Sequence, residues 1–352
     1  MRIAIVGAGS LGIVVGARLA PRFPDLVMVD ANPANVAALN QHGARVTGSI
    51  ELAVPVAAIE PTQMRGIYDL AILLTKQTYN EVALAQLEPH LGANSAVCTL
   101  QNGVPEENVA AVVGTRRTVG GIVGFGATYV APGVSRLTST AEAVEKHAFE
   151  IGEIDGAVTS RIRAIADVLS SVGHCEVVQD LTSIRWSKLL MNATFSGVST
   201  ALSCTFGDVL NDPVAMEFLA RVADEVIRVA HATGHHLAPT QGEDMESLRI
   251  ADGEGVDDKL PLYRRVWNHH ARLRASMLQD LEKGRKTEIG AINGYVVDRG
   301  REASIATPFN QLIVDLIRAA EARKHVPDPS RSRIAMKAMI ADNPLPIARA
   351  SN

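Results

Sequence analysis

Residues 1–20, MRIAIVGAGSLGIVVGARLA, decide the fold of the first half of the chain. The apolar run IAIV is followed at once by Gly7, Gly9 and Gly12 in the spacing GxGxxG, and then by an apolar helical stretch. Such glycines permit a tight turn, let the backbone approach a pyrophosphate, and allow close packing of helix on strand. The pattern predicts a phosphate-binding turn at a helix N-terminus, formed by Gly7, Ala8, Gly9, Ser10, Leu11 and Gly12. A glycine-rich turn without a ligand is the alternative.

Outward from this stretch, the first half of the chain alternates β-branched runs with helical segments. This order is typical of a parallel sheet covered by helices. It predicts an α/β, Rossmann-type doubly wound domain over residues 1–180. Between 133 and 153 the pattern changes to shorter strands, which predict an antiparallel extension of the sheet. The other expected strands are 3–6, 26–29, 70–74, 96–100, 118–123 and 176–179, and the expected helices include 79–91, 104–113 and 160–171.

The second half is almost entirely helical in pattern. Asp212 followed by Pro213 signals the start of a long helix that ends before Gly234, and Pro308 after Thr307 signals another. The glycine-rich acidic segment 251–258 predicts an exposed loop. These signals predict an all-helical domain over 181–325. The proline-containing tail over 326–352 is expected to be weakly ordered, although 334–340 could form a short helix.

Composition limits the function classes. The 352 residues carry a net charge of −4 without a dense basic stretch, which argues against nucleic acid as the main partner. No apolar run reaches the ~18 residues of a membrane span, and the first strand begins without the basic and apolar run of a signal peptide. We therefore expect no membrane partner and a cytoplasmic location.

Neither the cysteines nor the histidines predict a metal site. The three cysteines lie far apart, so buried thiols are expected rather than a disulfide framework or a zinc site. The adjacent pairs His235–His236 and His269–His270 show no metal-ligand spacing, and surface or helix-end roles are expected for them.

Asp30 bears on the choice of dinucleotide. It ends the second expected strand, 18 residues after Gly12, where a carboxylate accepts hydrogen bonds from ribose hydroxyls. A 2′-phosphate would meet this negative charge, and no arginine lies between Asp30 and Arg45 to receive it. The sequence thus favours NADH over NADPH. The alternative role of Asp30 is a cap of the helix that follows.

Several separated motifs resemble the ketopantoate reductase family, the 2-dehydropantoate 2-reductases. They are IVGAGSLG, LLTKQTYN with Lys76, QNG with Asn102, RWSKLLMNATFSGVSTAL with Lys188 and Asn192, and SMLQDLEKGRKTEIGAINGY with Ser276, Glu288 and Asn293. The resemblance implies a Rossmann domain, a helical domain like that of the 6-phosphogluconate dehydrogenases, and an active site in the cleft between them. It implies hydride transfer from NAD(P)H, which is NADPH in most members, to ketopantoate, giving pantoate for pantothenate synthesis. A homodimer is also expected.

Reduction of a ketone needs a proton donor at the developing alkoxide. Lys188, within a largely apolar helical stretch, is the candidate general acid. At about 100° per residue, Asn192 lies about 40° and Ser196 about 80° around the helix from Lys188, so all three can face the substrate. The family usually has a second asparagine where this chain has Ser196, and that difference bears on the substrate. Roles in ion pairing or helix packing are the alternatives.

The resemblance implies further site residues. Glu288 resembles the acidic catalytic residue that holds the lysine, and Ser276 the serine that binds the substrate carboxylate. Lys76 and Asn102, each after an expected strand, lie where doubly wound sheets bind ligands and are expected on the cofactor side. The alternatives are a helix-start carboxylate for Glu288, a helix-interior hydroxyl for Ser276, a solvated charge for Lys76 and a left-handed turn residue for Asn102.

Three functions remain after the motifs are combined. The first is reduction of ketopantoate with NAD(P)H. The second is an NAD-dependent 2-hydroxy acid dehydrogenase of the same family acting on another branched or aromatic 2-oxo acid, which Ser196 and Asp30 favour. The third is a dinucleotide-binding sensor without turnover, because fold alone does not establish activity.

Overall fold

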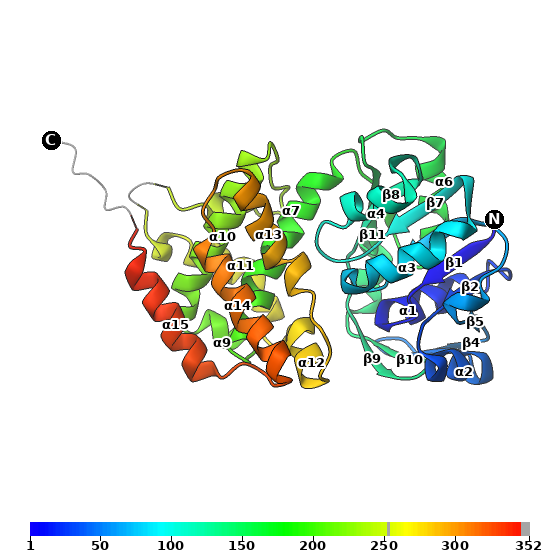
Figure 1. Ribbon diagram of the computed structural model, residues 1–352, viewed down its shortest axis with the longest axis horizontal. Coiled ribbons are helices and arrows are strands. Elements are labelled where there is room, and N and C mark those ends of the chain that lie inside the picture. Colours follow the sequence, from blue (N-terminus) through cyan, green and yellow to red (C-terminus); the bar gives the residue numbers. More distant parts are fainter. Residues whose placement is uncertain (252–253, 346–352) are drawn as a thin grey trace. The chain divides into compact units, whose positions relative to one another are not determined.

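The computed structural model describes residues 1–251 and 254–345, and the chain divides into two compact units, Met1–Leu181 and Thr182–Asn352 (Figure 1). The first unit is α/β and the described part of the second is helical. The predicted fold class is therefore confirmed. Among the described residues, none of the helices has the length and apolarity needed to cross a membrane.

The first unit, whose residues are all described, is built on an eight-stranded sheet with the order β12-β11-β8-β7-β6-β1-β2-β5. All neighbours are parallel except β8 and β11. From β1 the chain first adds strands on one side and then, from β6, on the other, so the switch point of the topology lies between β1 and β6. The strands are β1 (Ile3–Val6), β2 (Val27–Val29), β5 (Ala57–Ile59), β6 (Tyr68–Leu73), β7 (Leu91–Thr99), β8 (Thr118–Val123), β11 (Phe149–Glu153) and β12 (Cys175–Val177).

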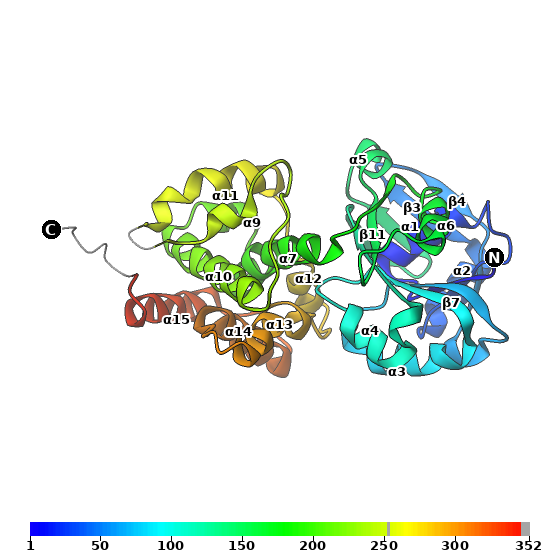
Figure 2. The same cartoon turned by 90° about the horizontal axis from the view of Figure 1, so that it is seen from above.

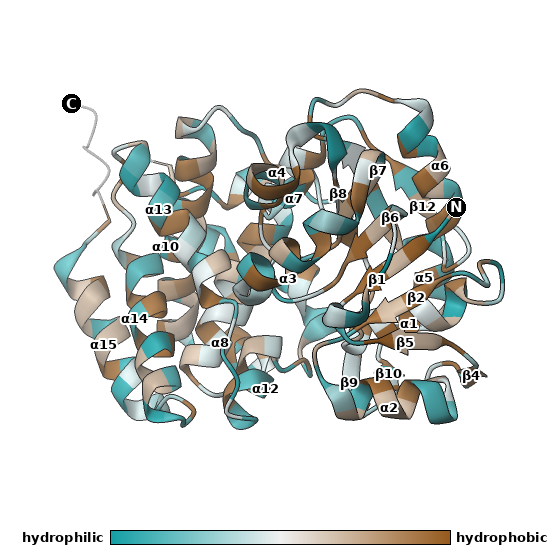
Figure 3. Ribbon diagram, turned by 45° about the vertical axis from the view of Figure 1, so that its right-hand side comes forward, coloured by the Kyte–Doolittle hydropathy of each residue, from teal (hydrophilic) through white to brown (hydrophobic). Residues whose placement is uncertain are grey.

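Both faces of this sheet are buried. Ile3 and Ile5 of β1 pack in a core with α1 (Ser10–Leu19) and α6 (Ser160–Leu169). Ala4 and Val6, which point the other way, pack in a second core with α3 (Asn80–Leu87) and α4 (Glu106–Val113) (Figure 2). Helices on both faces explain why central strands such as β1 and β2 are continuous apolar runs (Figure 3).

A second sheet corrects the prediction made for residues 133–153. β11 does extend the main sheet antiparallel to β8, but the strands before it form a separate sheet with the order β4-β3-β10-β9, and Ala141–Lys146 is helix α5. β10 pairs with β3, almost ninety residues earlier in the chain, and a local pattern does not reveal such a pairing. The sheet packs against α1 and consists of β3 (Ala44–Gly48), β4 (Leu52–Val54), β9 (Ala127–Ala131) and β10 (Val134–Leu137).

The second unit is arranged around α10 (Pro213–Ala232). The Asp212 side chain caps its N-terminus by accepting hydrogen bonds from the backbone of Val214 and Ala215, as the sequence predicted, and Gly234 follows its end with a φ of +81°. Helices pack against α10 on several sides (Figure 1). The other described α-helices are α7 (Leu181–Met191), α8 (Gly197–Ala201), α9 (Phe206–Leu210), α11 (Leu260–Trp267), α12 (Ser276–Glu282), α13 (Asn293–Glu302), α14 (Pro308–Arg323) and α15 (Pro329–Asp342).

The prediction of a weakly ordered tail over 326–352 is wrong for residues 329–342, which form α15, whereas the short helix predicted over 334–340 is confirmed as part of it. Pro329 occupies the first helical position, where no backbone N–H is needed, so this proline starts a helix rather than breaking one. α15 packs against α10, with Met336 fully buried and Arg333 ion-paired to Asp212. Residues 346–352, and residues 252–253 of the predicted loop, lie outside the described residues.

The Met336→Ala variant tests the packing of α15. We expect it to lower the free energy of unfolding by about 2–5 kcal/mol, because it leaves a cavity in a close-packed site. Ile334→Ala on the same helix is the control, because Ile334 is 69% exposed and should change stability by less than about 0.5 kcal/mol. Urea titration measures both. Equal, small effects would contradict a packed α15.

Candidate functional site

The glycines after β1 have different structural roles. Gly7 has a φ of +100° and its N–H donates to the Val29 carbonyl at 2.8 Å. A Cβ at Gly12 would lie 2.0 Å from the Gly7 carbonyl oxygen, whereas a Cβ at Gly9 would meet nothing within 4 Å. The fold itself therefore requires glycine at positions 7 and 12. The open space at Gly9 fits the approach of a ligand to the backbone.

The N-terminus of α1 lies directly above this turn. Gly9 is the N-cap residue and provides no capping side chain, so no side chain at this position accepts from the N–H groups of the first turn, which suits the binding of an anion such as phosphate. Two residues that the sequence analysis missed hold the turn in place. The Asn35 side chain donates to the Ala8 carbonyl at 2.8 Å, and the Ser135 hydroxyl donates to the Ser10 carbonyl at 2.8 Å. Both come from distant segments, and no local signal identifies them.

Asp30 directly follows β2, the neighbour of β1. Its N–H donates to the Ile59 carbonyl at 3.1 Å, and its Oδ1 accepts a hydrogen bond from the N–H of Asn32 at 2.9 Å. Asn32, not Asp30, is the N-cap of α2 (Pro33–His42), with its side chain accepting from Ala34. The alternative role of Asp30 as the helix cap is therefore wrong.

Lys76 and Asn102 lie at the same edge of the sheet as the glycine turn. Thr75, one residue before Lys76, is close to Gly7, since a Cβ on Gly7 would lie 2.6 Å from the Thr75 nitrogen. The Lys76 Nζ atom is buried. Asn102 follows β7, and the left-handed turn residue there is Gly103, with a φ of +76°, so the alternative for Asn102 is wrong.

Gln101 ties the ends of β6 and β7 together, a role that sequence reasoning missed. Its side-chain amide donates to the Thr75 carbonyl at 2.7 Å and to Asn80 Oδ1 at 2.6 Å. The Gln77 amide donates to the Asn102 carbonyl. Gln101 is 4% exposed. This buried network fixes the loops that carry Lys76 and Asn102 relative to each other.

In the helical unit, Lys188, Asn192 and Ser196 are half-buried, whereas most of their neighbours along the chain are fully buried. Lys188 belongs to α7, and Asn192–Ser196 form a π-helical segment. A π-helix turns less per residue than an α-helix, so the predicted further 40° between Asn192 and Ser196 is an overestimate. Ser196 lies closer to the line of Lys188 and Asn192 than regular helix geometry places it.

Asn293, which the sequence analysis quoted without a role, supports the π-helical segment. Its fully buried amide donates to the Ala193 carbonyl at 3.0 Å and to Asn310 Oδ1 at 2.9 Å. Asn310 in turn donates to Glu225 at 2.7 Å, and Glu225 accepts the N–H of Phe309 and Asn310 at the start of α14. Burial raises the pKa of Glu225 to about 7, against the lowering effect of these hydrogen bonds. A polar chain through three helices thus fixes the backbone between Asn192 and Ser196.

Glu288 and Ser276 occupy different environments in the same unit. Glu288 is 6% exposed and immediately precedes a 3₁₀ turn, Ile289–Ala291, in which the N–H of Ala291 donates to the Glu288 carbonyl. Ser276 is exposed as the first residue of α12, so its alternative as a helix-interior hydroxyl is wrong. α12 packs against α8, which begins directly after Ser196.

A family model described as ketopantoate reductase PanE/ApbA matches residues 3–156, and the model of its C-terminal part matches residues 180–321. The chain belongs to the ketopantoate reductase family. The resemblance seen in the motifs is thus confirmed.

Individual relatives agree over most of the chain. The 2-dehydropantoate 2-reductase of Archaeoglobus fulgidus is 29% identical over 322 residues, which cover 91% of this chain and 98% of the relative. The structure of 2-dehydropantoate 2-reductase from Geobacter metallireducens GS-15 has a TM-score of 0.76 at 26% identity and covers 91% of this chain and 100% of its own. A ternary structure of D-mandelate dehydrogenase with NADH and anilino(oxo)acetate has a TM-score of 0.79 at 22% identity and covers 92% of this chain and 99% of its own. This likeness shows that the two proteins share a fold.

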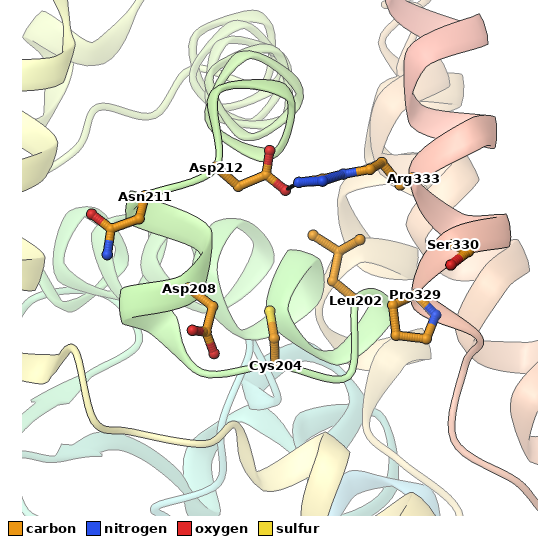
Figure 4. A pocket seen from close by; sticks show the side chains of 8 residues that line it. All are labelled: Leu202, Cys204, Asp208, Asn211, Asp212, Pro329, Ser330 and Arg333. Atoms are coloured by element: carbon orange, nitrogen blue, oxygen red, sulfur yellow. Dashed lines mark hydrogen bonds and ion pairs between the residues drawn. The ribbon is translucent and has the colours of Figure 1, made fainter.

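A pocket of this ketopantoate reductase family member lies apart from the site residues predicted above. It has a volume of about 340 Å³ and is closed on one side by the ion pair between Asp212 and Arg333 (Figure 4). Burial raises the pKa of the Cys204 thiol in this pocket to about 11. Cys98 and Cys175 are buried, as predicted, whereas Cys204 is only half-buried.

The variants Gly9→Ala and Gly12→Ala separate a ligand-binding glycine from a structural one. Gly12→Ala should destabilise the first unit, because its Cβ collides with the Gly7 carbonyl. Gly9→Ala should leave the melting temperature unchanged, because its Cβ meets open space, yet weaken NADH binding by roughly tenfold or more. Thermal melts and NADH titrations measure the two effects. Unchanged NADH affinity in Gly9→Ala would contradict phosphate binding at this turn.

Proposed function

We propose that this family member reduces ketopantoate to pantoate with NAD(P)H. The observation that carries the proposal is the half-buried row of Lys188, Asn192 and Ser196 in the helical unit of a chain whose other unit has an uncapped, glycine-lined helix N-terminus. The row of Lys188, Asn192 and Ser196 suits a polar substrate that must receive a proton. The glycine-lined helix N-terminus suits a dinucleotide, so the two features together fit reduction of a 2-oxo acid.

The residues of the first unit fit a nicotinamide dinucleotide. The turn from Gly7 to Gly12 would hold the pyrophosphate, and Asp30 would accept hydrogen bonds from the ribose hydroxyls. Lys76 and Asn102, at the same sheet edge, would contact the cofactor beyond the pyrophosphate. When bound, the reduced dinucleotide supplies a hydride to the carbonyl carbon of the substrate.

The helical unit supplies the proton and the substrate contacts. Lys188 donates a proton from its ammonium group to the carbonyl oxygen as negative charge develops there, so the ketone becomes an alcohol. Asn192 and Ser196 hydrogen-bond the substrate, and Ser276 binds its carboxylate with its exposed hydroxyl. Glu288 orients the lysine. Asn293 holds the π-helical backbone, and this keeps Asn192 and Ser196 in position.

Lys188→Ala tests the role of the lysine. We expect kcat to fall by roughly 10²–10⁴-fold, because the general acid is lost, with little change in the Kd for NADH. Lys337→Ala is the control, because Lys337 is an exposed lysine of the same unit. Steady-state kinetics and NADH fluorescence titration give the two values. Turnover within a few-fold of the wild type would contradict the assignment and would favour a dinucleotide-binding sensor.

Asp30→Asn tests the preference for NADH. The substitution removes the negative charge and retains an oxygen for the Asn32 N–H, so NADPH should bind better relative to NADH by about tenfold, or ~1.4 kcal/mol. Asp25→Asn, at an exposed position before the same strand, should leave the ratio unchanged. Competition titrations with both cofactors give the ratio. An unchanged ratio in Asp30→Asn would contradict a role of this carboxylate in cofactor choice.

A second candidate substrate class follows from Ser196. The family usually has an asparagine at this position, and the shorter hydroxyl changes the hydrogen bonds offered to the far end of the substrate. Together with Asp30, this favours an NAD-dependent 2-hydroxy acid dehydrogenase that acts on another branched or aromatic 2-oxo acid. For either substrate, we further propose that the enzyme is a homodimer, as the family resemblance implies.

A further inference from the structure

Three side chains with metal-binding atoms meet beside the C-terminal end of α10. They are His231 in the last turn of the helix, His236 after it, and Glu246 in the 3₁₀ turn Met245–Leu248. One ligand atom from each lies within 4.8 Å of the others. Adjacency along the chain groups His236 with His235, so sequence spacing alone does not reveal this group.

The group is compact and partly shielded from solvent. His231 Nε2 lies 2.6 Å from Glu246 Oε2, and His236 Nδ1 lies 3.9 Å from Glu246 Oε1. The side chains of His231 and Glu246 are 33% and 26% exposed, whereas that of His236 is 82% exposed. Two ligands are thus held by the fold, and the third can rotate in from solvent.

The backbone around the group fixes the carboxylate and the turn. The N–H of Leu237 donates to Glu246 Oε1 at 2.7 Å, and the N–H of Glu246 donates to the Asp244 side chain at 3.0 Å. Gly234, with a φ of +81°, lets the chain turn back after α10. The ring centroids of His236 and His231 are therefore 5.4 Å apart. Such support of ligating side chains is typical of metal sites.

We propose that His231, His236 and Glu246 bind one divalent transition-metal ion of the zinc class. Two imidazoles and one carboxylate form a ligand set suited to zinc rather than to magnesium or calcium, which prefer oxygen ligands. Bonds of about 2.0–2.2 Å place tetrahedral ligands roughly 3.4 Å apart, so His231 and Glu246 must separate slightly and the exposed His236 must move inward. The C-terminal end of α10 adds a partial negative charge that favours a cation.

Metal binding replaces the hydrogen bond between His231 and Glu246. That contact needs a proton between Nε2 and the carboxylate, whereas a bound metal needs the lone pair of Nε2. The ring proton of His231 then resides on Nδ1. Water completes the coordination on the solvent side.

The site stabilises a segment that packs on the helix of Lys188. Between His236 and Glu246, the Ala238 carbonyl accepts a hydrogen bond from the Ser187 hydroxyl at 2.6 Å, and the Ala238 N–H donates to the Ser183 carbonyl at 3.2 Å. Lys188 is the next residue after Ser187. A metal that joins both ends of this segment to α10 therefore braces α7. This role is structural and does not depend on the proposed reaction.

Calorimetric titration of the full, chelator-treated protein with Zn²⁺ tests the site. We expect one ion per chain with micromolar or tighter affinity, and a rise in melting temperature of roughly 5 °C at a hundredfold excess over Kd. His236→Ala and Glu246→Gln should each weaken binding at least tenfold. His236→Ala removes an exposed ring, so loss of folding does not complicate its result.

His325→Ala is the matched control, because His325 is an exposed histidine of the same unit outside the group. It should bind Zn²⁺ like the wild type. The proposal is overturned if the wild type shows no stoichiometric binding, or if His236→Ala and Glu246→Gln bind as tightly as the wild type.

Discussion

The close approach of α1 to the end of β1 is the constraint on which the first unit depends. Gly12 lies so near the Gly7 carbonyl that no side chain fits between them. This contact places the N-terminus of α1 over the ends of β1 and β6, the switch point of the sheet. Asp30, Lys76 and the loop of Asn102 reach the same edge because their strands are parallel to β1. The space left at Gly9 is the feature of this edge on which the proposed dinucleotide site depends.

The helical unit positions its polar row in a different way. A regular α-helix would carry Ser196 further from the line of Lys188 and Asn192, and the π-helical segment reduces that displacement. An irregular backbone in a buried helix needs partners, and Asn293 provides one at the Ala193 carbonyl. The hydrogen bonds continue through Asn310 to Glu225, so the geometry of the proposed substrate residues depends on α10, α13 and α14 together.

Features with a local cause could be predicted from the sequence. β1 and β8 occupy the predicted residues, because an apolar β-branched run between turn residues defines a strand by itself. The cap at Asp212 and the glycine turn were predicted for the same reason. The second sheet, the π-helical segment and the group of His231, His236 and Glu246 could not be predicted, because each depends on residues distant along the chain or on packing. Only residues 334–340 of α15 were predicted as a helix, because the prolines of this segment were taken as signs of weak order.

We propose that the glycine turn and the row of Lys188, Asn192 and Ser196 serve one reaction, the reduction of a 2-oxo acid. Initial rates of NADH and NADPH oxidation with ketopantoate, 2-oxoisovalerate and phenylglyoxylate test it most directly. We expect turnover with ketopantoate, with the greater rate from NADH. If only another 2-oxo acid is reduced, ketopantoate is not the substrate. If the protein binds a cofactor tightly but none of the three acids oxidises NADH or NADPH, the proposal that the two groups serve one reduction is contradicted.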